Sequence, residues 1–176
     1  MLQNFDNNAQ PDQAASRLAL VRLEMAKADI DGFIVPREDE FMGEYVPACG
    51  ERLKWLTGFG GSAGVAIILK NQAALFLDGR YTLEAENYID TENLSIVPIM
   101  QKAVHSWLSE KLEAGDKLAY DPKLHSIAQI KKLSAELDEK NITLAPLENN
   151  LIDLLWTDRP APPHGDIHPH STAYAG

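Results

Sequence analysis

The sequence predicts an α/β domain, with a mixed β-sheet and helices on both faces of that sheet. Two apolar runs, at 65–69 and 73–77, are separated by only the three polar residues 70–72, a spacing that is typical of a β-hairpin. After residue 94, short apolar runs alternate with segments of helical periodicity, as in strands that are connected by packed helices. A hairpin followed by alternating strands and helices predicts a mixed sheet.

Periodicity and breaker residues place the other elements of the first half. Apolar residues recur at helical spacing from residue 12 to residue 28, with Asp12 or Ser16 as the expected N-cap. The elements expected after this helix are a strand at 33–35 that stops at Pro36, a charged loop at 37–50, a short helix at 51–57, the glycine cluster at 58–64, the hairpin, and a helix at 80–89.

The second half of the chain alternates between strands and helices. Apolar residues at helical spacing mark two helices, and the strand between them is closed by Asp121 and Pro122. The elements expected here are a strand at 94–99, a helix at 104–112, a strand at 117–120, a helix at 127–137 and a strand at 142–147.

Length and proline content divide the chain into three parts. A chain of 176 residues suits one domain of ordinary size. Four of its ten prolines, at 160, 162, 163 and 169, lie close together, which indicates an extended linker that leads to a further domain. We therefore expect a disordered lead-in at 1–15, the α/β domain at 16–157 and a Pro-rich linker at 158–176.

Charge and composition exclude several classes of partner. The chain has 16 Lys and Arg against 26 Asp and Glu, a net charge of −10, and its basic residues are scattered. This argues against nucleic acid and against an anionic membrane surface. No apolar run approaches the roughly 18–20 residues of a spanning helix, and the polar first segment does not resemble a signal peptide. Since the single Cys49 also fits a reducing compartment, we expect a cytoplasmic protein.

The glycine cluster matches two known motifs, G-x-G-x-x-A and G-x-S-x-G, but in the wrong structural context. Both motifs need a strand before the loop and a helix after it, whereas here a strand follows. We therefore expect neither nucleotide binding nor a nucleophilic role for Ser62. A turn in which the backbone approaches a neighbour closely, or adopts a positive φ, explains the glycines better.

Histidines near the end of the chain raise the question of a metal site. His164, His168 and His170 lie close together, but a Pro-rich segment cannot hold them rigidly. Adventitious binding of zinc or nickel stays open, and no designed metal site is expected in this chain.

The string Asp78-Gly79-Arg80-Tyr81 at the end of the hairpin permits two interpretations. In the structural one, Asp78 caps the following turn and Tyr81 packs against the domain. In the functional one, Arg80 projects an exposed guanidinium that can meet a carboxylate or a partner subunit. The sequence alone leaves both open.

Several strings, in order and at matching spacing, resemble the N-terminal domain of Xaa-Pro aminopeptidases, in metallopeptidase family M24. The central match covers residues 52–59, 61–64 and 73–81, and supporting matches cover 29–36 and 149–160. The resemblance extends from about residue 16 to residue 176. It is closest to the three-domain type of this family.

The resemblance implies a creatinase-N-like domain with a ribonuclease-H-like sheet, which carries no catalytic residues. In this family a separate C-terminal domain holds two divalent metals, usually manganese, and removes the N-terminal residue of peptides that have proline in second position. A middle domain lies between the two. The resemblance therefore implies that this chain is inactive by itself and that its partners are its own middle and catalytic domains.

The N-terminal domains of this family also help to form homodimers and line the substrate entrance. By resemblance, the candidate residues for the interface or the entrance are Trp55, Phe59, Ser62, Arg80 and Tyr81. The alternative is a free-standing binding module that has the same fold and no peptidase activity. A reading frame that continues into a set of metal ligands would distinguish the two.

Overall fold

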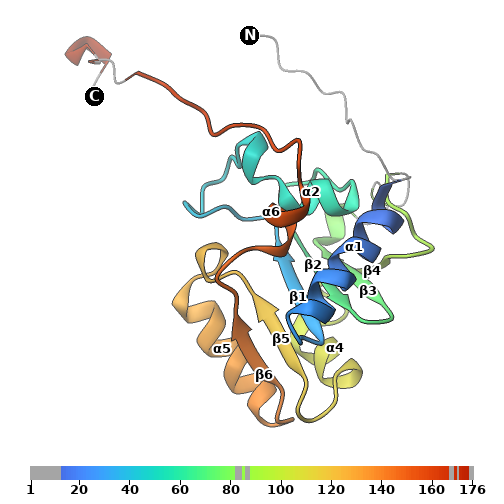
Figure 1. Ribbon diagram of the computed structural model, residues 1–176. Helices are drawn as coiled ribbons and strands as arrows, with labels where there is room; N and C mark the ends of the chain where they lie inside the picture. The colour runs from blue at the N-terminus through green and yellow to red at the C-terminus, as the bar shows by residue number, and fades with distance from the viewer. Residues whose placement is uncertain (1–12, 82–84, 86–87, 167–168, 170, 175–176) are drawn as a thin grey trace.

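The computed structural model describes residues 13–81, 85, 88–166, 169 and 171–174 (Figure 1). The first half of the domain contains α1 (Ala14–Lys27), β1 (Gly32–Pro36), α2 (Arg52–Thr57), β2 (Gly64–Leu69) and β3 (Ala73–Leu77). The second half contains β4 (Ser95–Pro98), α4 (Val104–Lys111), β5 (Lys117–Tyr120), α5 (Ile127–Asp138), β6 (Thr143–Pro146) and α6 (Leu151–Leu155). Short 3-10 turns lie at Ala48–Gly50, Gly79–Tyr81, Pro122–Leu124 and Thr172–Tyr174.

The six strands form one mixed sheet in the order β4-β3-β2-β1-β5-β6. β2 pairs antiparallel with β1 and with β3, and the other three pairs are parallel. The predicted hairpin is therefore confirmed, as are the mixed sheet and each predicted strand. All strands except β2 run in one direction, so the carboxyl ends of β1, β3 and β4 lie at the same edge of the sheet.

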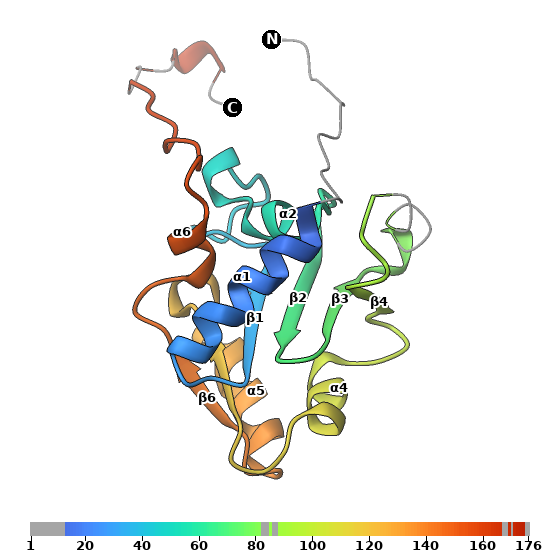
Figure 2. The same ribbon diagram turned by 45° about the vertical axis from the view of Figure 1, so that its right-hand side comes forward.

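Helices cover both faces of the sheet, as predicted (Figures 1 and 2). Side chains alternate along β1, so that Phe33 and Val35 pack with α1, α2 and α6 on one face. Ile34 points to the opposite face and joins the core that includes Trp107 of α4 and Leu137 of α5. The two buried clusters explain why the strand sequences are almost continuously apolar.

One expectation about the helices was wrong, and one helix was missed. Ser16 does not cap α1, because the helix already begins at Ala14 after Gln13, and the Ser16 hydroxyl donates to the Gln13 carbonyl at 2.8 Å. Asp12, the other expected cap, lies outside the described residues, as does half of the expected helix at 80–89, namely 82–84 and 86–87. α6 was not predicted; the side chain of Asn150 caps it by accepting from the Ile152 amide at 2.9 Å.

Beyond α6 the described chain leaves the domain as an exposed segment without regular structure up to residue 166 (Figure 2). Among the described helices, none combines the length and the apolar character that crossing a bilayer requires.

Candidate functional site

The glycine cluster forms a tight turn that connects α2 to β2. Gly58 ends α2 with a φ of +81°, and its amide donates to the Lys54 carbonyl at 2.8 Å. The Thr57 hydroxyl donates to the Leu53 carbonyl at 2.8 Å and accepts from the Phe59 amide at 3.1 Å. These bonds fix the start of the loop, and the left-handed conformation of Gly58 confirms part of the expected role of the glycines.

Phe59 is buried against two of these glycines. A methyl group on Gly61 would lie only 2.2 Å from Cζ of the Phe59 ring, and one on Gly64 would lie 3.1 Å from Cε1. The Phe59 ring is also in edge contact with Tyr81, at 5.6 Å between centroids and an angle of 79°. The close approach that was expected of the glycines is therefore an approach to Phe59.

Ser62 and Tyr81 form a polar pair at the surface. The Ser62 hydroxyl and the Tyr81 phenol oxygen lie 2.6 Å apart. This hydrogen bond lowers the pKa of Tyr81, an effect that burial opposes and that the charge of Arg80 reinforces. Within the described part of the chain, the hydroxyl of Ser62 bonds to no histidine or aspartate, so the arrangement is not that of a nucleophilic serine.

Arg80 is exposed and pairs within its own turn. The carboxylate of Asp78 accepts from the Arg80 amide and from Nε, both at 3.0 Å, and the guanidinium lies 5.5 Å from the centre of the Tyr81 ring. Asp78 therefore caps the turn and Tyr81 packs, as the structural interpretation predicted. The side chain of Arg80 is nevertheless 71% exposed, so most of it is accessible to solvent and the functional interpretation also stays open.

Trp55, the fifth candidate, belongs to a different region. Its ring stacks on Trp156 at 5.9 Å, and the guanidinium of Arg17 lies 4.6 Å from its centroid. The structure therefore brings four candidates together, Phe59, Ser62, Arg80 and Tyr81, which we call the glycine-loop cluster. Trp55 lies instead where the chain leaves the domain.

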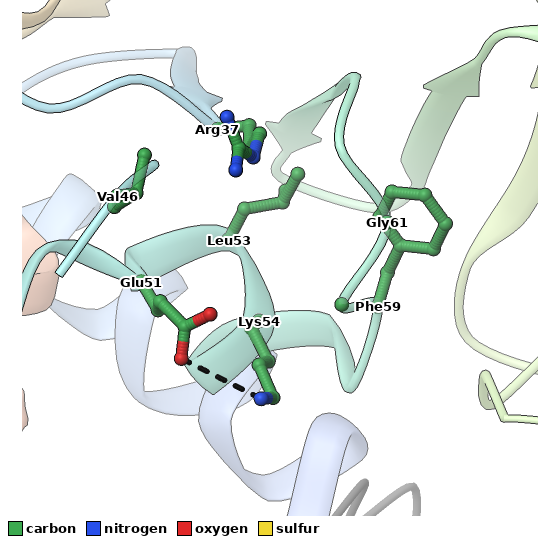
Figure 3. Close-up of a pocket in the computed structure, with 8 residues that line it drawn as sticks. Arg37, Val46, Glu51, Leu53, Lys54, Phe59 and Gly61 are labelled. Atoms are coloured by element: carbon green, nitrogen blue, oxygen red, sulfur yellow. Dashed lines mark hydrogen bonds and ion pairs between the residues drawn. The ribbon is translucent and has the colours of Figure 1, made fainter. Parts of the chain in front are cut away.

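Two hollows adjoin the glycine-loop cluster. The smaller one has a volume of about 10 Å³ and lies beside Phe59, between Arg37 and the Glu51–Lys54 ion pair (Figure 3). It has room for no more than one water molecule and cannot hold a peptide.

The larger hollow is a groove of about 590 Å³ at the carboxyl edge of the sheet, between α4 and α5. Its lining includes the apolar side chains of Val65, Val104 and Leu133, together with Ser62 and Asp78. Two histidines also line the groove, His105 and His125. His105 pairs with Glu136 at 3.2 Å. Burial lowers the pKa of His125, against a smaller opposing effect of the Asp121 charge. A groove of this size is suited to a small ligand or a peptide side chain.

No group of three or more potential metal ligands is found among the described residues. His168 and His170 lie outside them, and His164 is exposed. The described side chains therefore do not fit a two-metal catalytic centre.

An ionic network at the end of the domain was not anticipated from the sequence. Arg52, only 5% exposed, binds Asp153 through two hydrogen bonds of 2.7 and 2.9 Å. Asp153 also pairs with Arg159 at 2.7 Å, and Nε of Arg159 donates to the Cys49 carbonyl at the same distance. No local pattern reveals this network, since Arg52 and Asp153 are 101 positions apart.

Comparison with known proteins identifies the family. The family model described as Creatinase/Prolidase N-terminal domain matches residues 17–155. A probable Xaa-Pro aminopeptidase P of Aspergillus niger is 37% identical over 92% of this chain, and that of Aspergillus flavus is 34% identical over 99% of it. The chain spans about a quarter of the length of these curated relatives, 27% in both cases.

Solved structures share the fold. The X-prolyl aminopeptidase of Caenorhabditis elegans, described as a cytosolic enzyme with a di-nuclear active site, is 28% identical with a TM-score of 0.80. The match covers 84% of this chain and 26% of that one. The N-terminal domain of the Mycobacterium tuberculosis peptidase PepQ, 22% identical with a TM-score of 0.60 over 80% of this chain and 98% of that one, shows the likeness of fold alone. The chain therefore belongs to the creatinase/prolidase N-terminal domain family.

Proposed function

We propose that this chain is the non-catalytic N-terminal domain of a cytoplasmic Xaa-Pro aminopeptidase, an enzyme that removes the N-terminal residue of peptides that have proline in second position. The observation that carries the proposal is the similarity to aminopeptidase P relatives across almost the whole chain, although the chain spans only 27% of their length. In this proposal residues 1–15 are a lead-in, 16–157 are the domain, and 158–176 are a linker toward a middle domain.

Catalysis is assigned to the part of the enzyme that this chain does not contain. Two divalent metals, proposed to be manganese, would activate a water molecule and stabilise the developing negative charge there. The description of the Caenorhabditis elegans relative as di-nuclear supports two metals. In this proposal the metal ligands come from outside this chain, and the described residues contain no group of three or more potential ligands.

The proposed role of the glycine-loop cluster is to contact the peptide at the substrate entrance or a second subunit of a homodimer. Its polar groups are exposed yet fixed in place, because Ser62 is bonded to Tyr81 and Asp78 holds the backbone and Nε of Arg80. A group that is already ordered loses less conformational entropy on binding than a free side chain. The exposed guanidinium can then bind a carboxylate through its remaining donors.

The catalytic part of the proposal is tested with the purified chain. We expect that the chain with added manganese releases no amino acid from a Xaa-Pro-Xaa tripeptide, whereas the longer protein does. Metal-dependent release by the 176-residue chain alone would contradict the proposal. A transcript whose reading frame stops directly after Gly176 would instead favour the free-standing binding module.

The role of the cluster is tested by Arg80→Ala in the longer enzyme. Loss of a charged contact worth on the order of 1.5–3 kcal/mol should lower kcat/KM, or the affinity of the dimer, by about tenfold or more. The matched control is Lys54→Ala, which removes a basic side chain outside the cluster. Unchanged kcat/KM and an unchanged dimer, together with a slightly lower melting temperature, would show that Arg80 only supports the fold.

A further inference from the structure

The residues that join α6 to the exposed segment contact several distant parts of the domain at once. Asp153, on α6, accepts from Arg52 of α2 and from Arg159 of the segment. Arg159 continues the connection to the turn at Ala48–Gly50 through the Cys49 carbonyl, at 2.7 Å. We call Asp153, Trp156 and Arg159 the exit root.

Stacked side chains hold the exit root from a second side. Trp156 stacks on Trp55 with an angle of 25° between the rings. Trp55 is itself held by Arg17 of α1, which lies over its ring and donates to its carbonyl oxygen. Segments from α1 and α2 therefore hold the exit root at Trp156 by aromatic contacts, whereas Arg159, three residues further on, is held by its polar contacts.

The ion pairs and the helix depend on one another. α6 has five residues, too few for a helix that is stable by itself, so its position depends on its contacts. Burial disfavours the charged form of Arg52, but the hydrogen bonds and charge of Asp153 outweigh this and raise its pKa. Both arginines share one carboxylate, so the loss of Asp153 would leave two cations without their partner.

The segment beyond the exit root is stiff in composition. The four residues after Arg159 include three prolines, Pro160, Pro162 and Pro163. Such a sequence favours an extended backbone with little conformational freedom. A stiff segment transmits the direction of its first residues to whatever follows. Its orientation is therefore decided at the exit root.

We propose that Asp153 is a positioning residue that holds the exit segment in one direction relative to the domain, so that residues 157–166 act as a fixed arm and not as a flexible tether. What the arm leads to rests on the proposed function. The direction of the arm does not, because every contact that sets it lies within this chain.

The direct test is the distribution of distances between two spin labels in the 176-residue chain. The labels are placed at Ala135→Cys, exposed on α5, and at His164→Cys, exposed on the arm, in a Cys49→Ser background. Cys49→Ser keeps the backbone carbonyl that Arg159 uses. We expect a single narrow distribution in this reference protein and a distribution at least twice as wide after Asp153→Asn or Arg159→Met.

Controls separate positioning from unfolding. Circular dichroism shows whether Asp153→Asn folds. If it does not fold, Arg159→Met tests the proposal instead, because this variant leaves the Arg52–Asp153 pair intact. Asp166→Asn removes an exposed carboxylate from the same segment and should leave the width unchanged. A wide distribution in the reference protein, or an unchanged width in Arg159→Met, overturns the proposal. Because no peptidase activity is measured, its failure is distinguishable from failure of the proposed function.

Discussion

The glycine-loop cluster and the exit root both combine an arginine–aspartate pair with packed aromatic rings, but they differ in burial and in sequence separation. Arg80 is 71% exposed and binds Asp78, two positions away. Arg52 is 5% exposed and binds Asp153, 101 positions away. The first pair shapes one turn, whereas the second joins distant elements. The comparison shows that the role of an arginine–aspartate pair depends on its burial. A buried pair joins distant parts of the fold, whereas an exposed pair leaves its arginine available for a contact.

Arg52→Met should have the largest effect on stability. The substitution removes two charged hydrogen bonds from a largely buried site, and since Asp153 is 28% exposed and keeps its pair with Arg159 we expect a loss of about 1.5–3 kcal/mol. Urea unfolding measures this change in the free energy of unfolding. Arg80→Met is the matched control, and its exposed pair should contribute less than about 1 kcal/mol. Equal losses in the two variants would remove the distinction between the two regions.

Gly61→Ala should destabilise the glycine-loop cluster next most strongly. The added methyl group would lie 2.2 Å from the buried Phe59 ring, which must shift and so disturb its edge contact with Tyr81. Overpacking of this kind costs about 1–3 kcal/mol, measurable by thermal or urea unfolding. Gly79→Ala is the control, because a methyl group there meets no atom within 4 Å. If both variants were as stable as the parent, the ring would be free to move.

Alkaline titration tests whether the cluster is ordered in solution. The hydrogen bond from Ser62 lowers the pKa of Tyr81, so this phenol should ionise early when absorbance is followed near the phenolate maximum. Since its pKa is lower in the folded than in the unfolded chain, ionisation of Tyr81 adds stability that appears as the pH rises through the folded pKa and is lost as the pH falls through it.

In that titration, Ser62→Ala should move the early step to higher pH, and Tyr81→Phe should abolish it. An early step that persists in Tyr81→Phe would belong to another tyrosine and would weaken the description of the cluster.

The smallest expected effect is that of Ser62→Ala on stability. It removes one solvent-exposed hydrogen bond, worth at most about 0.5–1 kcal/mol. In the longer enzyme it should also leave the labelling by a serine-directed fluorophosphonate unchanged. Stoichiometric labelling of Ser62 that disappears in the variant would revive a serine hydrolase.

Much of the fold could be predicted because its signals are local. The hairpin follows from two apolar runs around a short turn, and the helices α4 and α5 follow from a repeat of three to four residues. α6 was missed because five residues are too few to show such a repeat. The cap of α1 was misplaced because the hydroxyl of Ser16 can bond to a carbonyl within the first turn as well as cap it.

The candidate site was predicted only in part. The family resemblance pointed to five residues, and four of them lie together, since Phe59 and Ser62 precede β2 while Arg80 and Tyr81 follow β3, its partner in the hairpin. Trp55 lies elsewhere because α2 turns its ring toward Trp156. Neighbours on a hairpin can be inferred from the sequence, whereas the direction of a helical side chain depends on what the helix packs against.

The sequence by itself determined the fold class, the strands, the tight glycine turn and the acidic surface, because periodicity, turn residues and charge are properties of neighbouring residues. Only the tertiary structure decided the strand order β4-β3-β2-β1-β5-β6, the burial of Arg52 and its pairing with Asp153. The physical reason is that a contact across 101 positions has no local signature. It exists because the sheet and the helical layer on one of its faces bring α2 and α6 together and exclude water from the guanidinium between them.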